Sequence, residues 1–279
     1  MIHTLARPAA NEVIPLDKEK LLDLAKDPRF IPGIYNYCDR WCERCTMTSA
    51  CLVYSTLEDR SNDPASFDVR NAEFWQELQE IFQETLELIE SWATENGVDL
   101  ESVDADPALA DLASRRAQAK NHELVQAGHR YANTVNQWFS EQFPSAGSVI
   151  ENEIESEGRI LDQSMQNLDE HTEDAVEIIR WYQYQIMVKL VRGLSSDDDE
   201  EAAENDWQSD SDGSVKVALI GMDRSIMAWR TMLETFPARA AGIRSTLLNL
   251  EQLRRRTEQT FPRARAFTRP GFDISPLIS

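Results

Sequence analysis

The chain has 279 residues and a formal net charge of −21, with 49 Asp and Glu against 28 Lys and Arg. A surface this acidic argues against general nucleic-acid binding, because neutralising phosphates requires a basic face. No window approaches the ~18 consecutive apolar residues that suggest a membrane span, and residues 1–13 hold no apolar run of signal-peptide length. The composition therefore predicts a cytoplasmic protein.

The only four cysteines of the chain follow a short N-terminal helix. Residues 1–16 are expected to form an extended arm, and the helix that begins at Asp17 ends at the turn of Pro32 and Gly33. The cysteines are spaced C-x3-C-x2-C-x5-C and are Cys38, Cys42, Cys45 and Cys51. Four thiolates complete the ligand shell of Zn²⁺ or of a [4Fe–4S] cluster. The spacing predicts that these four residues form a metal centre.

The pattern leaves the metal open between iron and zinc. Zinc sites usually combine two C-x2-C pairs separated by ~12–20 residues, whereas only Cys42 and Cys45 form such a pair here. A single short loop that carries all four thiolates favours a [4Fe–4S] cluster, whose irons are spread over several ångströms. A structural zinc site with the same four cysteines is the alternative. Disulfides or free thiols are the third interpretation, which a reducing compartment disfavours.

The stretch Cys38-x3-Cys42-x2-Cys45 resembles the loop of radical S-adenosylmethionine enzymes. The resemblance implies that three cysteines hold the cluster while the fourth iron is left open for the methionine moiety. It covers eight residues, and that family places the loop after the first strand of a (β/α) barrel, whereas this sequence has no strand pattern. Because Cys51 offers a fourth thiolate, the residues favour a closed centre with a structural or electron-transfer role.

A helical body follows a linker at residues 61–66. The first long helix is predicted over residues 71–96, with Gly97 as the terminating residue. Its apolar stripe is Phe74, Leu78, Ile81, Thr85, Leu88 and Trp92. Beside it runs an acidic stripe of Glu73, Glu77, Glu80, Glu84 and Glu87. The second helix is predicted over residues 106–143, because Asp106 and Pro107 form a helix start.

The third helix is expected to be the longest, over residues 148–192, which at 1.5 Å per residue is roughly 65–70 Å. Only the break at residues 144–147 separates it from the second helix, so the two should be antiparallel. Residues 195–213 then hold nine acids and no base. Such a segment is typical of a solvated loop, and we expect it to be dispensable.

The clearest heptad pattern of the chain belongs to the fourth helix, at Val215, Leu219, Met222, Ile226, Trp229, Leu233 and Phe236. Pro237 separates it from a fifth helix over residues 238–261, and the tail from Pro262 is expected to be extended. These elements predict an all-α fold with a long antiparallel bundle of four or five helices. Residues 1–66 would form the N-terminal arm and Cys-rich module, and residues 67–279 the bundle with the acidic loop 195–213.

Long helices rich in Glu also raise the possibility of a di-iron carboxylate site, which needs Glu-x-x-His on two helices. No Glu stands three residues before His122, His129 or His171, so the motif is absent. His122 and His129 are predicted at the surface, opposite the apolar seam of the second helix. His171 and Glu157 are predicted on the inward side of the third helix, and whether they form a second site stays open.

Charge is unevenly distributed along the chain. Residues 71–114 carry twelve acids and no Lys or Arg, whereas residues 224–269 carry ten Arg and three acids. We expect the acidic stripe of the first helix to lie beside the arginines of the fifth, which are Arg244, Arg254, Arg255 and Arg256. That pairing would leave no basic face for nucleic acid. The alternative is a C-terminal surface that binds RNA or phosphate.

Two functional hypotheses follow from the sequence. In the first, Cys38, Cys42, Cys45 and Cys51 hold a [4Fe–4S] cluster for electron transfer or redox sensing, with a redox or protein partner. In the second, the chain is a non-enzymatic interaction or scaffold protein with a structural four-cysteine zinc site. The sequence contains no Gly-rich phosphate loop, nucleophile elbow or Ser-His-Asp set, so no catalytic residue is assigned.

Overall fold

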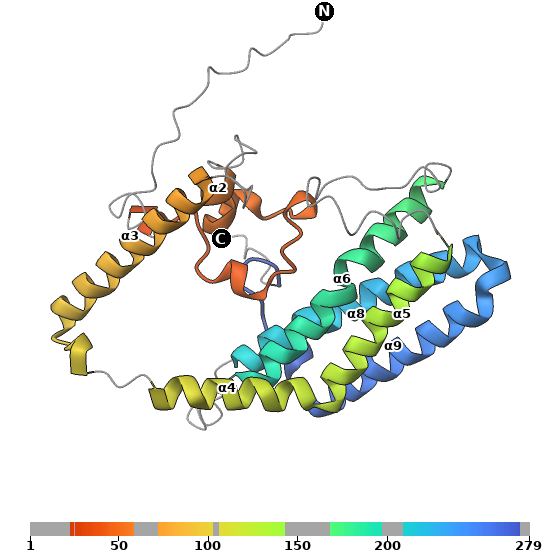
Figure 1. Ribbon diagram of the computed structural model, residues 1–279. Helices are drawn as coiled ribbons and strands as arrows, with labels where there is room; N and C mark the ends of the chain where they lie inside the picture. Colours follow the sequence, from red (N-terminus) through yellow and green to blue (C-terminus); the bar gives the residue numbers. More distant parts are fainter. Residues whose placement is uncertain are drawn as a thin grey trace, which may run out of the picture. The chain divides into compact units, whose positions relative to one another are not determined.

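A computed structural model describes residues 23, 24, 26–58, 72–102, 106–142, 168–196 and 209–273. Within these ranges every regular element is helical, and none is a strand (Figure 1). The predicted all-α class is confirmed. The barrel strands that accompany the radical S-adenosylmethionine loop are therefore not found in the described ranges.

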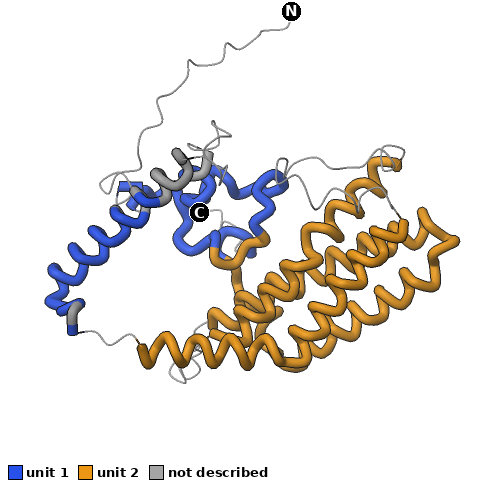
Figure 2. The backbone as a smooth tube through the Cα atoms, in the orientation of Figure 1, with its two compact units in different colours: residues 1–35, 40–105, 270–279 blue, residues 36–39, 106–269 orange. Residues whose placement is uncertain are grey.

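The chain divides into two compact units (Figure 2). Unit 1 comprises residues 1–35, 40–105 and 270–279, and unit 2 comprises residues 36–39 and 106–269. The predicted domain boundary between residues 66 and 67 lies outside the described residues. The short segment 36–39, which carries one cysteine, thus belongs with the helices of unit 2.

Unit 1 contains the helices α2 (Leu52–Glu58) and α3 (Ala72–Asn96). The predicted end of α3 is confirmed. Gly97 has φ +67°, a conformation that costs glycine little. The Gly97 N–H donates to the Thr94 carbonyl at 3.3 Å and the Val98 N–H to the Ala93 carbonyl at 2.8 Å, which together form a Schellman motif. The last residue of the predicted apolar stripe, Trp92, is exposed.

Unit 2 is built from α4 (Asp106–Asn121), α5 (Glu123–Gln142), α6 (Glu170–Ser195), α8 (Asp210–Thr235) and α9 (Ala240–Thr260). Helices α6 and α8 lie against each other along most of their length, with α5 and α9 beside them (Figure 1). The predicted break at Pro237 is present as the short turn η8 (Pro237–Arg239). The tail, predicted to be extended, instead forms η9 (Ala264–Ala266) and buries Phe267.

The heptad predicted for the fourth helix forms the centre of this core. Val215, Leu219, Met222, Ile226 and Trp229 of α8 are all buried. Near the end of the helix the pattern shifts, because Met232 is buried whereas Leu233 is only half-buried. A 3.6-residue helix drifts from a strict seven-residue repeat, so a late heptad position rotates out of the interface.

Trp229 is the largest fully buried side chain of α8. Its ring meets that of Trp138 edge to face, with centroids 5.3 Å apart and an angle of 88°. Its Nε1 donates a hydrogen bond to the Tyr131 hydroxyl at 3.1 Å, which satisfies the one polar group that the indole buries. Burial raises the pKa of Tyr131 to about 12, so this phenol is neutral at neutral pH.

Helices α6 and α8 approach closely where glycine takes the place of a side chain. A β-carbon at Gly221 would lie 2.8 Å from Tyr182 Cδ1, and one at Gly193 would lie 2.5 Å from Val215 Cγ2. A β-carbon at Gly213 would lie 2.5 Å from the Tyr37 ring and 2.6 Å from Phe267 Cζ. The α6–α8 contact therefore depends on the absence of a methyl group at Gly193 and Gly221, and Gly213 allows Tyr37 and Phe267 to pack on α8.

The single helix predicted over residues 106–143 is wrong, because the chain breaks between α4 and α5. His122 lies at the break, and α5 leaves α4 at an angle (Figure 1). The Nδ1 atom of His122 accepts a hydrogen bond from the Leu124 N–H at 3.2 Å, so the His122 side chain caps the start of α5. His122 is half-buried in this role, whereas His129 is exposed as predicted.

The third predicted helix also begins later than expected. Asp169 has extended backbone angles (φ −73°, ψ 158°), and its carboxylate accepts the Thr172 N–H at 3.1 Å, so α6 begins at Glu170. Hydrogen bonds from the Thr172 hydroxyl and from its N–H lower the pKa of Asp169. The rest of the predicted segment, residues 148–167, lies outside the described residues, as does Glu157.

The predicted acidic loop 195–213 is wrong at its C-terminal end, since Ser209 caps α8 and the next residues form its first turn. Asp212 is 7% exposed and Gly213 is buried. Although partial burial acts to raise it, the pKa of Asp210 is lowered because Arg192 donates to its carboxylate at 2.6 Å. Carboxylates in the first turn of a helix interact favourably with the helix dipole, so Asp210 and Asp212 stabilise the start of α8. Residues 197–208 lie outside the described residues.

We expect Ser209→Ala to lower the free energy of unfolding by about 1 kcal/mol, because the hydroxyl accepts the Asp212 N–H at 3.0 Å and this helix end is buried. Urea titration followed by circular dichroism measures the change. Thr260→Ala is the control, since the Thr260 hydroxyl at the exposed end of α9 donates only to a carbonyl of its own helix. Equal stability of Ser209→Ala and wild type would contradict the assigned cap.

The arginines of α9 pair with carboxylates of their own unit. Arg254 contacts Asp223 at 3.1 Å. Arg255 contacts Glu251 at 3.9 Å, and Arg256 contacts Glu123 at 3.8 Å. The predicted pairing of Arg244, Arg254, Arg255 and Arg256 with the acidic stripe of residues 73–87 stays a prediction, because most side chains of that stripe lie outside the described residues. Of these contacts, only the one of Arg254 with Asp223 is within hydrogen-bond distance.

Candidate metal centre

The cysteine stretch is a series of short helical turns. They are η1 (Ile34–Tyr37), η2 (Cys42–Arg44) and η3 (Thr48–Ala50), and α2 follows directly after Cys51. None of the four cysteines forms a disulfide, and each is half-buried. Cys38 belongs to unit 2, whereas Cys42, Cys45 and Cys51 belong to unit 1.

Within unit 1, a tight turn joins Cys42 to Cys45. The Cys45 N–H donates to the Cys42 carbonyl at 3.1 Å, which closes the turn. The Met47 N–H then donates to Cys45 Sγ at 3.3 Å. Hydrogen bonds from backbone N–H groups to sulfur stabilise thiolate ligands and tune the potential of the iron–sulfur clusters that they hold. The C-x2-C turn therefore has a feature typical of a metal ligand.

An aromatic residue and an arginine lie within this turn. The Arg44 guanidinium is 4.1 Å from the centre of the Trp41 ring, a cation–π contact, and Trp41 itself is 8% exposed. Arg40 adopts φ +58°, which is uncommon for a residue other than glycine. The sequence predicted an apolar wrapping with nearby arginines, and Trp41 with Arg44 supplies such a pair in unit 1.

Within unit 2, the segment Asn36–Asp39 is held by side chains of α6. The Asn36 carbonyl accepts from Arg192 Nη1 at 3.2 Å, and the Asp39 carbonyl accepts from Trp181 Nε1 at 3.0 Å and from Gln185. The backbone is thus fixed on both sides of Cys38. A ligand whose backbone is already ordered loses less conformational entropy on metal binding.

The Asp39 carboxylate completes this attachment. It accepts the Tyr182 hydroxyl at 2.5 Å and Arg224 Nη1 at 2.7 Å. Burial, together with the neighbouring Asp39 carboxylate, raises the pKa of Tyr182, so the phenol remains a neutral donor. Sequence reasoning missed this network, because Tyr182 and Arg224 lie more than 140 positions from Asp39 and no local pattern connects them.

The described side chains do not assemble a metal site. Among them, no group of three or more His, Cys, Asp or Glu residues is close enough to hold a metal ion. The donor chemistry nevertheless fits, since none of the four cysteines forms a disulfide and one sulfur already accepts a backbone hydrogen bond. The chemistry of the four residues thus supports their use as ligands.

The other candidate residues named from the sequence are His171 and Glu157, which are not part of the cysteine stretch. His171 was predicted to face inward but is exposed in the first turn of α6, so that prediction is wrong. The buried face of this turn is instead formed by Thr172, Ala175 and Val176. Whether His171 and Glu157 form a second site stays open, because Glu157 lies outside the described residues.

We expect Asp39→Ala to lower the free energy of unfolding of unit 2 by about 1–3 kcal/mol, because it leaves the buried Tyr182 hydroxyl without its acceptor. Urea titration followed by circular dichroism reads out this change. Glu234→Ala, an exposed change near the end of α8, is the control and should be close to neutral. Identical stability of the two variants would contradict the anchoring role of Asp39.

Comparison of the chain with protein-family models, with curated proteins and with solved structures returns no match in any of the three. Among the described residues, no helix has the length and apolar character needed to cross a membrane. The functional argument therefore depends on the residues of the chain itself.

Proposed function

We propose that Cys38, Cys42, Cys45 and Cys51 bind a [4Fe–4S] cluster that serves electron transfer or redox sensing. The observation that carries the proposal is the spacing of four cysteines within fourteen residues, with Cys45 Sγ already accepting a backbone N–H at 3.3 Å. Four thiolates fill every iron of such a cluster, which leaves no open iron for a substrate. A closed cluster suits electron transfer better than substrate activation.

The other residues of the stretch would support the cluster through charge and packing. A [4Fe–4S] cluster with four thiolates carries about −2 net charge, which the arginines Arg40 and Arg44 in the same stretch can offset. The half-buried state of the cysteines limits contact with solvent, which shifts the potential of a bound cluster. The chain's partner would be a redox protein or another protein that senses the state of the cluster.

A structural four-cysteine zinc site in a non-enzymatic interaction protein is the second candidate. The C-x2-C turn at Cys42 and Cys45, with its N–H to sulfur hydrogen bond, equally suits one half of such a site. In that case the metal would order residues 38–51 and take no part in electron transfer.

Metal and sulfide analysis after anaerobic purification separates these candidates. The iron–sulfur proposal predicts about four iron and four acid-labile sulfide per chain, with visible absorption that bleaches on reduction. The zinc alternative predicts about one zinc per chain and no visible absorption. A chain that holds neither metal after anaerobic reconstitution with iron and sulfide, or with zinc, would rule out both.

A further inference from the structure

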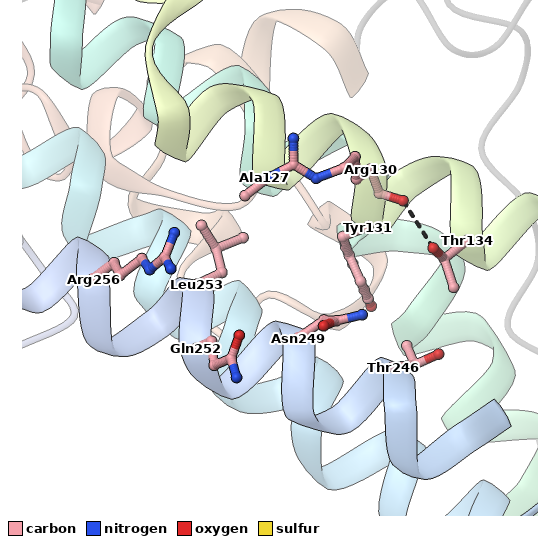
Figure 3. Close-up of a pocket in the computed structure, with 9 residues that line it drawn as sticks. All are labelled: Ala127, Arg130, Tyr131, Thr134, Thr246, Asn249, Gln252, Leu253 and Arg256. Atoms are coloured by element: carbon pink, nitrogen blue, oxygen red, sulfur yellow. Dashed lines mark hydrogen bonds between the residues drawn. The ribbon is translucent and has the colours of Figure 1, made fainter. Parts of the chain in front are cut away.

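A cleft of about 220 Å³ lies between α5 and α9, entirely within unit 2 (Figure 3). Its floor is formed by the buried side chains Tyr131, Thr246 and Leu253. Its rim is polar and exposed, with Arg130 on α5 and both Asn249 and Arg256 on α9. The cleft thus combines a buried floor with charged and amide groups at its rim.

The rim residues occupy positions where two packed helices normally bury apolar side chains. On α5 the lining residues are spaced i, i+3, i+4 and i+7 from Ala127, and on α9 they include positions i, i+3, i+7 and i+10 from Thr246. Each set is one face of its helix, and the two faces look toward each other (Figure 3). The space between these facing residues is open to a ligand.

Neither rim arginine forms a close ion pair with a carboxylate of the described part of the chain. Within the described ranges no carboxylate pairs with the Arg130 guanidinium. Arg256 lies 3.8 Å from Glu123, beyond hydrogen-bond distance, and both side chains are mostly exposed. By contrast, Arg265 contacts Asp223 at 2.6 Å. In a chain of net charge −21, arginines without close carboxylates are available for an anion from solution.

We propose that this cleft binds a small organic anion through a carboxylate or phosphate group held between Arg130 and Arg256. Guanidinium groups form paired, charge-assisted hydrogen bonds to both kinds of oxyanion. The Asn249 amide can donate to a further oxygen, and the floor adds no negative charge, because the buried Tyr131 phenol is neutral. The volume is below the about 300–1,000 Å³ of drug-sized sites, so the ligand is small.

Titration calorimetry with inorganic phosphate and with citrate, on the full chain at constant ionic strength, tests the proposal. Wild type should bind at least one of the two with one site per chain. Phosphate binding alone would identify a phosphate ligand, and citrate binding alone a carboxylate ligand. Arg130→Gln and Arg256→Gln should each weaken the binding about tenfold or more, because each removes a charge-assisted contact.

Arg244→Gln and Arg116→Gln are matched controls, since both arginines are exposed on the same unit but do not line the cleft. Both should keep the wild-type affinity, and circular dichroism checks that every variant remains folded. The proposal is overturned if neither anion binds wild type saturably. It is also overturned if the control variants lose affinity as much as the cleft variants, because binding would then follow overall charge.

Discussion

Cys42→Ser is expected to lose nearly all of the metal bound by the wild-type chain. A serine hydroxyl is a hard, weakly acidic ligand, and both candidate centres need four thiolates to complete their shells. Residues 30–55 should become more accessible to protease, since their short turns bury few side chains. The helices of unit 2 should keep their circular dichroism signal, because Cys42 belongs to unit 1. Metal analysis of the purified variant gives the result directly.

Ser49→Ala is the matched control for that experiment. Ser49 lies between Cys45 and Cys51 and is exposed, so its loss should leave the metal content unchanged. Cys38→Ser, Cys45→Ser and Cys51→Ser should each repeat the loss seen for Cys42→Ser. Full metal content in all four single variants would show that the cysteines do not act as one site.

Trp229→Ala is expected to lower the free energy of unfolding by about 3–5 kcal/mol, because the side chain is 0% exposed and its removal leaves a large cavity. The change also removes the edge-to-face contact with Trp138 and the hydrogen bond to the Tyr131 hydroxyl. Guanidinium titration followed by circular dichroism measures this loss, with the slope of the transition as a check on two-state behaviour.

Met227→Ala is the control on the same helix. Met227 is 60% exposed, so its truncation should change the free energy of unfolding by no more than about 0.5 kcal/mol. A cost below about 1 kcal/mol for Trp229→Ala would mean that the site collapses around the smaller residue. That outcome would contradict the close-packed core described for α5 and α8.

The sequence predicted the helices whose burial follows a regular period. The α8 pattern from Val215 to Trp229 is buried at every predicted position, and the end of α3 at Gly97 is present as expected. These predictions succeeded because helical periodicity and a terminating glycine are local signals. The all-α class followed for the same reason.

The predicted helix bounds were wrong where a side chain accepts a backbone N–H and so fixes the start of a helix. His122 accepts the Leu124 N–H and divides one predicted helix into α4 and α5. Asp169 and Ser209 cap α6 and α8, although the sequence analysis assigned the first to a helix interior and the second to a loop. Asp and Ser serve as caps or as solvated residues, and only the packing around them decides between these roles.

The candidate site shows the limit of local reasoning more clearly. The cysteine spacing identified four ligands, but the attachment of Asp39 to Tyr182 and Arg224 involves residues far apart in sequence. The cleft at Arg130 and Arg256 was missed for the same reason. Arg130 lies on the exposed side of α5, and Arg256 is one of many arginines in the C-terminal part of the chain. Nothing in the sequence shows that α5 and α9 face each other.

The glycines at the close contacts of α8 have a consequence for how this sequence can change over time. At Gly213 a methyl group would meet the rings of Tyr37 and Phe267, and at Gly221 it would meet Tyr182. A larger residue at either position therefore requires a smaller partner ring in the same lineage. We expect position 213 to covary with positions 37 and 267, and position 221 with position 182, so that relatives of this chain would reveal the packing of unit 2 through coupled substitutions.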